Sequence, residues 1–406
     1  MNVLFILPYC YIKEKKIGWD TGFGIYTVQL AEELAKREDL HIYVLSLRQR
    51  FQRDFTINNV TYIGFKDAEI VHSFVKGRHS IQQTRKIVKN TYYRQDLLRK
   101  TLIAAYVVGR TNTLAAIIEK YSIDFVHIHS LAQEMAGVFE SESIRKDNTL
   151  VTVHSTFIKE EKYGNYIHYF RDSAKSLLER GYHMSFISSG VKEQFINELG
   201  ELDTSKERMH VVLNGTVFTD TKIQRKKSKK KLFVCVGTVC DRKNQMQLLD
   251  ALRLLNSSDL SNILIYVLGR DATEGKFEER IKQYGLEQCV QCIGFVSPES
   301  MKTYYSEASG NILLSKEEAF GLSIIEGFQY GIPTLCFNDI SAAVDIYNPE
   351  AVQLVEDRSN ESLARSISVF MNKEWNTEVI KQWAQRYSLD YVTDQYFNLY
   401  KAIKDK

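Results

Sequence analysis

The stretch EEAFGLSIIEGFQYGIP, residues 317–333, decides the expected fold of this 406-residue chain. It follows GNILLS (310–315), a short apolar run of the kind that forms a buried strand. After Gly321 the apolar residues recur at helical spacing, and Gly331 with Pro333 is a stop signal. The expected order is therefore strand, glycine turn, helix.

This order creates a place for a phosphorylated ligand. A helix that begins after a glycine offers unpaired backbone N–H groups and the positive end of its dipole, and Ser323 adds a hydroxyl. Glu318 before the turn and Glu326 one turn inside the helix can accept hydrogen bonds from sugar hydroxyls. Taken alone, such an acid pair is more often a helix-capping acid and a solvated helix residue.

Length and composition describe an ordinary soluble protein with about two domains of roughly 200 residues each. Apolar residues make up 44% and charged residues 25% of the chain. We find no apolar run of about 18 residues and no signal-peptide pattern at the start, so we expect neither a membrane span nor export. The six scattered cysteines favour reduced thiols and a cytoplasmic location, and the lone CxxC at 289–292 does not favour a zinc or redox site.

Residues 76–110 stand out by their charge. Nine Lys or Arg accompany the single acid Asp96, and apolar residues recur near helical spacing. A basic amphipathic helix can bind the anionic inner face of a membrane, which predicts a peripheral membrane contact. A domain helix with a solvated basic face explains the pattern equally well, and nucleic acid is not favoured because no binding module accompanies the charge.

The chain contains two successive sets of alternating strand and helix patterns. Each set predicts one doubly wound parallel sheet. His129 and His154 end two strands of the first set, where ligands of such sheets bind. Gly24 follows Gly22 at the start of the first helix, but Thr27 stands where a dinucleotide fingerprint needs its third glycine. The charge run 224–231 separates the two sets as an exposed linker. We predict a first domain at 1–217, a linker at 218–231, a second domain at 232–385, and a C-terminal helix at 386–406.

In this order and spacing, the motifs resemble the retaining glycosyltransferases of family 4, which have the GT-B fold. The resemblance covers nearly the whole chain and is most specific at 317–333. The other motifs that carry it are the glycine-opened first helix, DFVHIHS, VTVHS, ISSGVKE, VVLNGT and VGTVCDRKNQ. It implies two Rossmann-like domains facing across a cleft, with the last helix crossing back to the first domain.

The resemblance also assigns roles to residues. It implies that Glu318 contacts the donor sugar, that Glu326 contacts the nucleotide ribose, and that Gly321 and Leu322 present N–H groups to the diphosphate. His154 matches the family histidine that contacts the donor sugar. The remaining residues implied at the nucleotide-sugar site are Gly24, Gly237, Thr238, Arg242, Lys243 and Ser323.

Two positions depart from the family pattern. Thr238 stands in place of the usual arginine, so we leave open whether Arg242 supplies the missing cation beside Lys243. Asn244 stands in place of the usual glycine after the lysine.

The implied activity is transfer of a sugar, with retention and without a metal or other cofactor, from a UDP- or GDP-linked donor to a glycan or lipid-linked glycan. Bacterial-type polysaccharide or glycoconjugate synthesis is the expected context. The alternatives are a non-catalytic subunit of a protein-glycosylating complex, which the loss at Thr238 favours slightly, and a nucleotide-sugar epimerase of similar fold.

Overall fold

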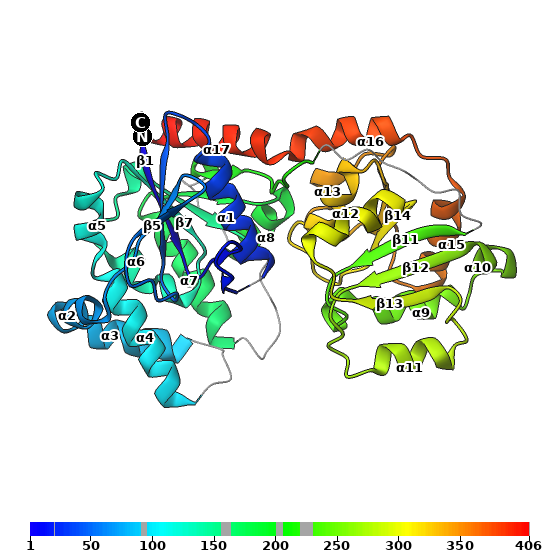
Figure 1. The fold of residues 1–406 in the computed structure, drawn as a ribbon, viewed down its shortest axis with the longest axis horizontal. Helices are drawn as coiled ribbons and strands as arrows, with labels where there is room; N and C mark the ends of the chain where they lie inside the picture. Colours follow the sequence, from blue (N-terminus) through cyan, green and yellow to red (C-terminus); the bar gives the residue numbers. More distant parts are fainter. Residues whose placement is uncertain (20, 91–95, 156–163, 200–205, 220–229, 406) are drawn as a thin grey trace. The chain divides into compact units, whose positions relative to one another are not determined.

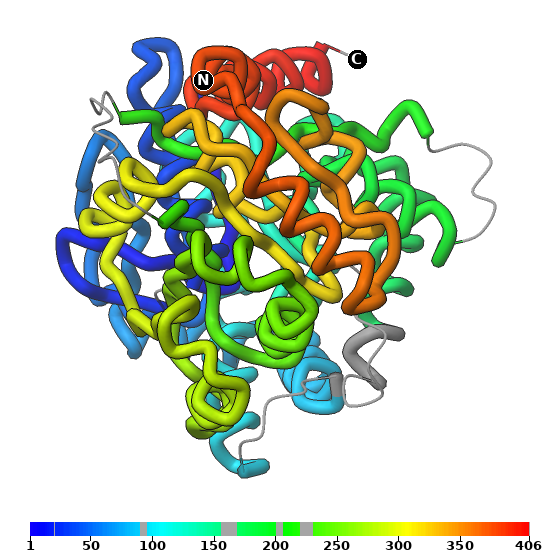
Figure 2. Tube along the Cα trace, turned by 90° about the vertical axis from the view of Figure 1, so that its right-hand side faces the viewer, coloured from blue at the N-terminus to red at the C-terminus, as the bar shows by residue number. Residues whose placement is uncertain are grey.

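The computed structural model describes residues 1–19, 21–90, 96–155, 164–199, 206–219 and 230–405. The chain forms two compact units, and its described course can be followed in Figures 1 and 2. The first comprises Met1–Ile187, Val191–Val212 and Val392–Lys406, and the second comprises Ser188–Gly190 and Leu213–Tyr391. The charge run at 224–231 lies mostly outside the described residues.

The first unit is built on an eight-stranded sheet of order β10-β9-β8-β7-β1-β4-β6-β5. All neighbours are parallel except β5 and β6, which form an antiparallel hairpin. The strands are β1 (Asn2–Leu7), β4 (His41–Ser46), β5 (Phe55–Ile57), β6 (Val60–Tyr62), β7 (Phe125–His129), β8 (Thr149–Val153), β9 (His183–Phe186) and β10 (Met209–Val211). A separate two-stranded ribbon, β2 (Tyr11–Ile12) with β3 (Ile17–Gly18), occupies the loop after β1.

Helices cover the strands of this unit. β1, β7 and β8 are buried along nearly their whole length, as apolar runs in a parallel sheet require. The helices are α1 (Gly22–Leu34), α2 (Asp67–Lys76), α3 (Ser80–Asn90), α4 (Leu97–Thr111), α5 (Leu114–Lys120), α6 (Ala136–Glu140), α7 (Gly164–Glu179) and α8 (Ser189–Leu199).

The basic segment 76–110 is not one helix. It spans the end of α2, all of α3 and most of α4, which pack together in the first unit (Figure 1). Gly77 and Gly109 mark close approaches here, because a Cβ at Gly109 would lie 2.7 Å from the Ile70 carbonyl oxygen. By length and composition alone, Leu97–Lys120 could cross a membrane, and half of its apolar window is buried in the protein.

The second unit contains a six-stranded, fully parallel sheet of order β13-β12-β11-β14-β15-β16. Its strands are β11 (Lys231–Val236), β12 (Ile263–Leu268), β13 (Val290–Gly294), β14 (Gly310–Leu313), β15 (Thr334–Phe337) and β16 (Val352–Val355). Its helices are α9 (Gln245–Leu252), α10 (Ser257–Asn262), α11 (Lys276–Gln283), α12 (Pro298–Glu307), α13 (Leu322–Gln329), α14 (Ala343–Ile346), α15 (Asn360–Asn372) and α16 (Thr377–Ala384).

The chain ends in α17 (Leu389–Lys404), whose part from Val392 onward belongs to the first unit. Tyr400 of this helix lies against β7, with its hydroxyl 2.6 Å from Nδ1 of the buried His127. Lys404 and Asp124 form an ion pair at the same end, and Arg37 pairs with Asp394. The last helix therefore packs back on the first unit, as the resemblance implied.

Candidate active site

The strand order of the second unit places a site at one edge of its sheet. The chain runs outward from β11 to β13 on one side and from β14 to β16 on the other, so the order reverses between β11 and β14. Ligands of such sheets bind outside the carboxyl ends of the strands at this switch point. The loops that follow β11 and β14 carry Lys243 and Glu318, respectively.

Two glycines allow these loops to turn tightly. Gly237, directly after β11, has a φ of +136°, and a Cβ there would lie 3.3 Å from Cε of Lys243. Gly321, directly before α13, has a φ of +83°, and a Cβ there would lie 2.9 Å from Ile324. Both positions favour glycine, because side chains are strained in the left-handed region and space is short.

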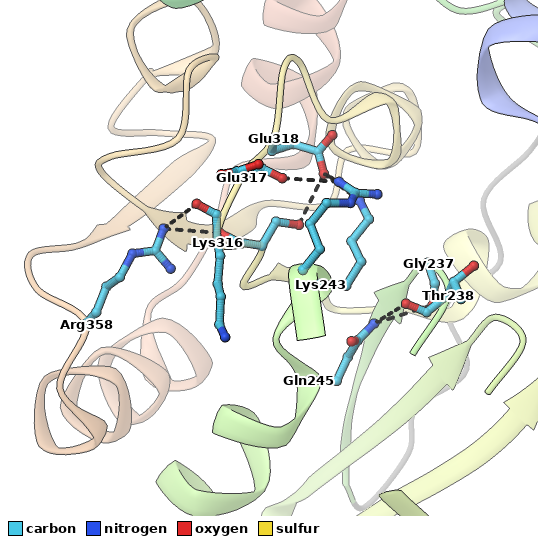
Figure 3. A network of polar contacts seen from close by, with 10 residues as sticks. Gly237, Thr238, Lys243, Gln245, Lys316, Glu317, Glu318 and Arg358 are labelled. Atoms are coloured by element: carbon cyan, nitrogen blue, oxygen red, sulfur yellow. Dashed lines mark hydrogen bonds and ion pairs between the residues drawn. The ribbon is translucent and has the colours of Figure 1, made fainter. Parts of the chain in front are cut away.

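Lys243 and Glu318 form the centre of the site, although 75 residues separate them in the chain (Figure 3). The Lys243 ammonium donates a hydrogen bond to Oε2 of Glu318, and both side chains are mostly buried. Arg242 approaches the same oxygen at 3.9 Å and donates to the Glu317 carbonyl at 3.1 Å. Since an ammonium has three N–H donors, Lys243 can hold Glu318 and a phosphate oxygen together.

Neighbouring residues that sequence reasoning did not single out hold the two loops in place (Figure 3). The buried amide of Gln245 donates to the carbonyls of Gly237 and Thr238. Arg358 donates to the carbonyls of Ser315 and Lys316 at 3.2 and 3.3 Å. These residues lack a sequence signal of their own, because the contacts are to backbone oxygens that any residue carries.

The helix α13 begins at the glycine turn, as the sequence predicts. Gly321 is the N-cap residue, and no side chain caps the helix, so Glu318 is not the capping acid. The Ile324 amide donates to the Gly321 carbonyl at 2.9 Å, whereas the preceding amides of the first turn have no intrahelical acceptor. These N–H groups lie beside the Lys243–Glu318 pair in the chain's fold and can bind an anion.

Glu326 lies further along α13 and has a different partner. The Tyr305 hydroxyl donates to its Oε2 at 2.9 Å, and burial raises the pKa of the Glu326 carboxyl above its usual 4.5. Tyr305 is itself fully buried. The tyrosine, which sequence reasoning missed, fixes the rotamer of Glu326 from α12.

Residues 217–387, which contain this entire network, match the family described as glycosyl transferases group 1. This part of the chain is a glycosyl transferases group 1 domain. The match confirms the predicted resemblance at the level of group 1 glycosyl transferases, for the part of the chain that holds Lys243, Glu318 and Glu326, while family 4 and retention stay predictions.

The chain is also similar to known proteins in sequence and in fold. A 2-deoxystreptamine N-acetyl-D-glucosaminyltransferase of Niallia circulans is 23% identical over 254 residues, which cover 59% of this chain and 64% of that protein. The chain thus matches somewhat less than two thirds of that relative. Among solved structures, the apo lipopolysaccharide outer core galactosyltransferase WaaB has a TM-score of 0.62 at 16% identity, with both chains fully covered. Anabaena HepE in complex with UDP and glucose has a TM-score of 0.67 at 13% identity, covering 99% of this chain and 100% of HepE.

These likenesses confirm the predicted fold class, GT-B with two Rossmann-like units, because they extend beyond the group 1 domain to the first unit. Within the group 1 domain, the structure brings Gly237, Arg242, Lys243 and Glu318 together. Thr238, which replaces the family arginine, is exposed at the start of the same loop. Leu322 and Ser323 occupy the first turn of α13, and the Ser323 carbonyl accepts from Asn311.

His154 and Gly24 belong to the first unit, outside the group 1 domain. His154 follows β8, and its Nε2 lies 3.0 Å from Nδ1 of His129 at the end of β7. Burial lowers the pKa of His154 to about 3, so its imidazole is neutral near pH 7 and acts as a hydrogen-bonding group. Gly24 has a local reason to be glycine, because a Cβ there would lie 2.6 Å from the Trp19 carbonyl oxygen.

The cysteines are all free thiols, and Cys289 and Cys292 have raised pKa values because of burial. Among the residues the structure describes, no three His, Cys, Asp or Glu side chains gather in a way that could hold a metal ion.

Proposed function

We propose that this protein is a retaining, metal-independent glycosyltransferase that uses a UDP- or GDP-linked sugar. The observation that carries the proposal is the Lys243–Glu318 pair beside the first turn of α13, at the switch point of the group 1 domain. A cation, an unpaired helix N-terminus and a sugar-binding carboxylate are the groups that a nucleoside diphosphate sugar needs.

Each residue has a role in this proposal. Lys243, with Arg242 and the amides of Gly321 and Leu322, stabilises the charge that develops on the departing diphosphate. Glu318 accepts hydrogen bonds from the donor sugar. The two remaining donor-binding side chains are Glu326 for the ribose and the neutral His154 for the sugar.

The chemistry requires a proton acceptor for the attacking hydroxyl. In the proposed reaction, the acceptor oxygen forms the new bond to the anomeric carbon on the face from which the diphosphate leaves, and the departing phosphate oxygen takes the proton. Positive charge from Lys243 and the helix amides makes this departure easier, so no metal ion is invoked. The anomeric configuration of the donor is then kept in the product.

The proposed acceptor is a glycan or a lipid-linked glycan in polysaccharide or glycoconjugate synthesis. Support comes from WaaB, which acts on the outer core of lipopolysaccharide, and from HepE, which binds UDP and glucose. The relative from Niallia circulans is named for transfer to 2-deoxystreptamine. An aminocyclitol is therefore the alternative acceptor, to be assayed beside glycans.

The test is turnover of UDP- and GDP-sugars by the purified chain, followed as release of nucleoside diphosphate. We expect Lys243→Met to lower kcat by about 100-fold or more, because a preorganised donor to the developing charge is lost. Lys302→Met, at an exposed lysine of α12, is the matched control. Undiminished turnover by Lys243→Met contradicts the proposal. The anomeric configuration of the product, determined by NMR, tests retention. Turnover in excess EDTA tests metal independence.

We further propose a cytoplasmic location with peripheral contact to an anionic membrane through the basic segment 76–110 and its neighbour α2. Large apolar side chains that are 61–74% exposed gather on these helices: Val71, Val75, Ile81, Leu97, Leu98 and Leu102. Exposed lysines and arginines accompany them, among them Lys76, Arg78, Arg85 and Arg99. Apolar burial and charge attraction together favour an anionic lipid surface over a solvated basic face.

Sedimentation with vesicles tests this contact. We expect salt-sensitive binding to vesicles that contain phosphatidylglycerol and weak binding to pure phosphatidylcholine. The double change Leu98→Ser and Leu102→Ser removes two exposed apolar side chains from the proposed membrane-binding surface and lowers binding, whereas Val369→Ser, at a comparably exposed site on α15, leaves it unchanged. Equal binding by all three proteins, or self-association in place of vesicle binding, contradicts the proposal.

A further inference from the structure

The first unit has a switch point of its own, and an aromatic cluster lies there. Its strand order reverses between β1 and β7, in the same way that the order of the second unit reverses between β11 and β14. The residues after β1 and β7 therefore flank the place where a ligand of this sheet binds. The switch-point cluster consists of Tyr9 after β1, Trp19 after the β2–β3 ribbon, and Phe23 in α1.

The rings of this cluster form a continuous series that ends at His154. Tyr9 lies 4.7 Å from Trp19 and 5.2 Å from Phe23, measured between ring centroids. Phe23 in turn meets His154 edge to face at 5.1 Å. The series therefore joins Trp19 at the surface to the histidine proposed to contact the donor sugar.

Trp19 is the exposed member, and the backbone around it is fixed. Its side chain is 41% exposed. Its amide donates to the Cys10 carbonyl at 3.3 Å, and its carbonyl accepts from Thr21 at 2.8 Å. Gly18, with a φ of +109°, and Gly24 leave the room for this path, because a Cβ on either would collide with the backbone.

A buried ion pair supports the indole from one side. The Arg48 guanidinium lies over the Trp19 ring, 4.0 Å from its centroid. Arg48 also pairs with Glu134 at 3.4 Å, and the two side chains are only 7% and 4% exposed. Withdrawing both charges from water is expensive, so a buried pair adds little stability over an apolar one of the same shape. The pair does keep the guanidinium over the indole.

The indole keeps surface that a ligand can cover, since Trp19 is 41% exposed. One oxygen of Glu134 also lacks a hydrogen-bond partner within the described chain, although it is buried. A buried polar atom without a partner needs an explanation, and a polar group of a ligand at the switch point would supply the partner here. The exposed indole, which Arg48 links to Glu134, is a flat, rigid, apolar surface whose face carries partial negative charge.

We propose that Trp19 is the stacking platform for a pyranose ring of the acceptor. The C–H bonds on one face of a pyranose are apolar and weakly positive, so they pack on the negative face of an indole, while the hydroxyls around the ring stay hydrated or hydrogen-bonded. Arg48 and Glu134 are positioning residues that fix the platform. This inference rests on the proposed glycosyltransferase function and adds to it the residue that recognises the acceptor ring.

The experiment compares the native chain with Trp19→Ala and Trp19→Phe in two assays. Donor hydrolysis without an acceptor is followed as diphosphate release. Transfer to a panel of methyl glycosides of glucose, galactose, mannose and N-acetylglucosamine is followed with the same readout. Tyr347→Ala, at an aromatic residue 47% exposed in the second unit, is the matched control.

We expect Trp19→Ala to raise the acceptor KM about tenfold or more, which corresponds to about 1.4 kcal/mol, with little effect on donor hydrolysis. Trp19→Phe retains part of the acceptor affinity, because a smaller ring still stacks. Sugars accepted by the native chain also change its tryptophan fluorescence, and this change disappears in Trp19→Phe.

Two results overturn the inference. One is an acceptor KM that is the same in Trp19→Ala as in the native chain. The other is a native chain that hydrolyses its donor while neither its turnover nor its fluorescence responds to any glycoside. A native chain without turnover of any donor instead contradicts the proposed function, so the two failures are distinguishable.

Discussion

At the scale of single residues, the departures from the family pattern have physical explanations. Asn244, which replaces a glycine, has a φ of +59° and is the N-cap residue of α9. Asparagine is among the few residues that adopt this left-handed conformation readily, so the backbone path is kept. Thr238 supplies no cation, but Arg242 lies 3.9 Å from the carboxylate that also binds Lys243. We infer that positive charge is retained at the site by a different residue.

Glu326 provides a prediction at this scale. Burial raises the pKa of its carboxyl, and only the ionised form accepts hydrogen bonds through both oxygens. We therefore expect the affinity for UDP or GDP to be full above the raised pKa and to fall as the pH drops through it. Because the pKa lies above 4.5, this loss begins at a higher pH than for an ordinary glutamate.

Isothermal titration across pH with native protein and Glu326→Gln measures this effect. The terminal phosphate of the nucleotide also titrates, near a pH of about 6, so the informative quantity is the difference between the two proteins. We expect weaker binding and a shallower pH dependence for Glu326→Gln, whereas Glu361→Gln, on the exposed start of α15, resembles the native protein. Identical pH profiles for native and Glu326→Gln exclude ribose recognition by this carboxylate.

At the scale of secondary-structure elements, α13 and α17 illustrate two ways in which helices are positioned. α13 has eight residues, begins after a glycine and ends before Gly331, so local sequence determines both of its ends. α17 is placed by long-range contacts. Its Tyr400 binds His127, which is 273 residues away in the chain and fully buried.

Tyr400→Phe tests the contribution of this contact. The change leaves Nδ1 of a buried imidazole without its partner, and an unsatisfied buried polar group costs about 1–3 kcal/mol. We expect the free energy of unfolding of the first unit to fall by that amount, which lowers its Tm by about 2–4 °C per kcal/mol. Urea and thermal unfolding measure this, with Tyr391→Phe as the control because that ring is 49% exposed. Equal stability of native protein and Tyr400→Phe contradicts this, because it means that Nδ1 of His127 loses nothing when the hydroxyl is removed.

At the scale of the whole molecule, the same arrangement occurs twice. In each unit the first strand of the sheet, β1 or β11, lies in its middle. The next strands extend the sheet on one side, and the chain then returns to add the remaining strands on the other side. Each switch point carries the residues with the clearest chemistry, Lys243 and Glu318 in one unit, and Trp19 with Glu134 in the other. The two proposals, for donor and for acceptor, therefore follow from one topological rule applied to two sheets.

Much of this architecture was predictable from the sequence. The alternation of apolar strands with helices predicts two parallel sheets, and the glycine turn predicts the start of α13, because both signals are local. Short elements without strong periodicity were missed: the β2–β3 ribbon, the β5–β6 hairpin and the division of 76–110 between three helices. Two- or three-residue strands carry too few residues for a pattern, and their pairing is decided by distant neighbours.

The sequence by itself determined the fold class and the group 1 match of residues 217–387, and it proposed Lys243, Glu318 and Glu326 as site residues, because these depend on residue type and spacing along the chain. Only the tertiary structure decided which groups meet: Glu318 with Lys243, Glu326 with Tyr305, and Trp19 with Arg48 and Glu134. Spacing along the chain carries no information about such pairs. Strand order in the sheet brings their loops together, and that order is set by long-range packing.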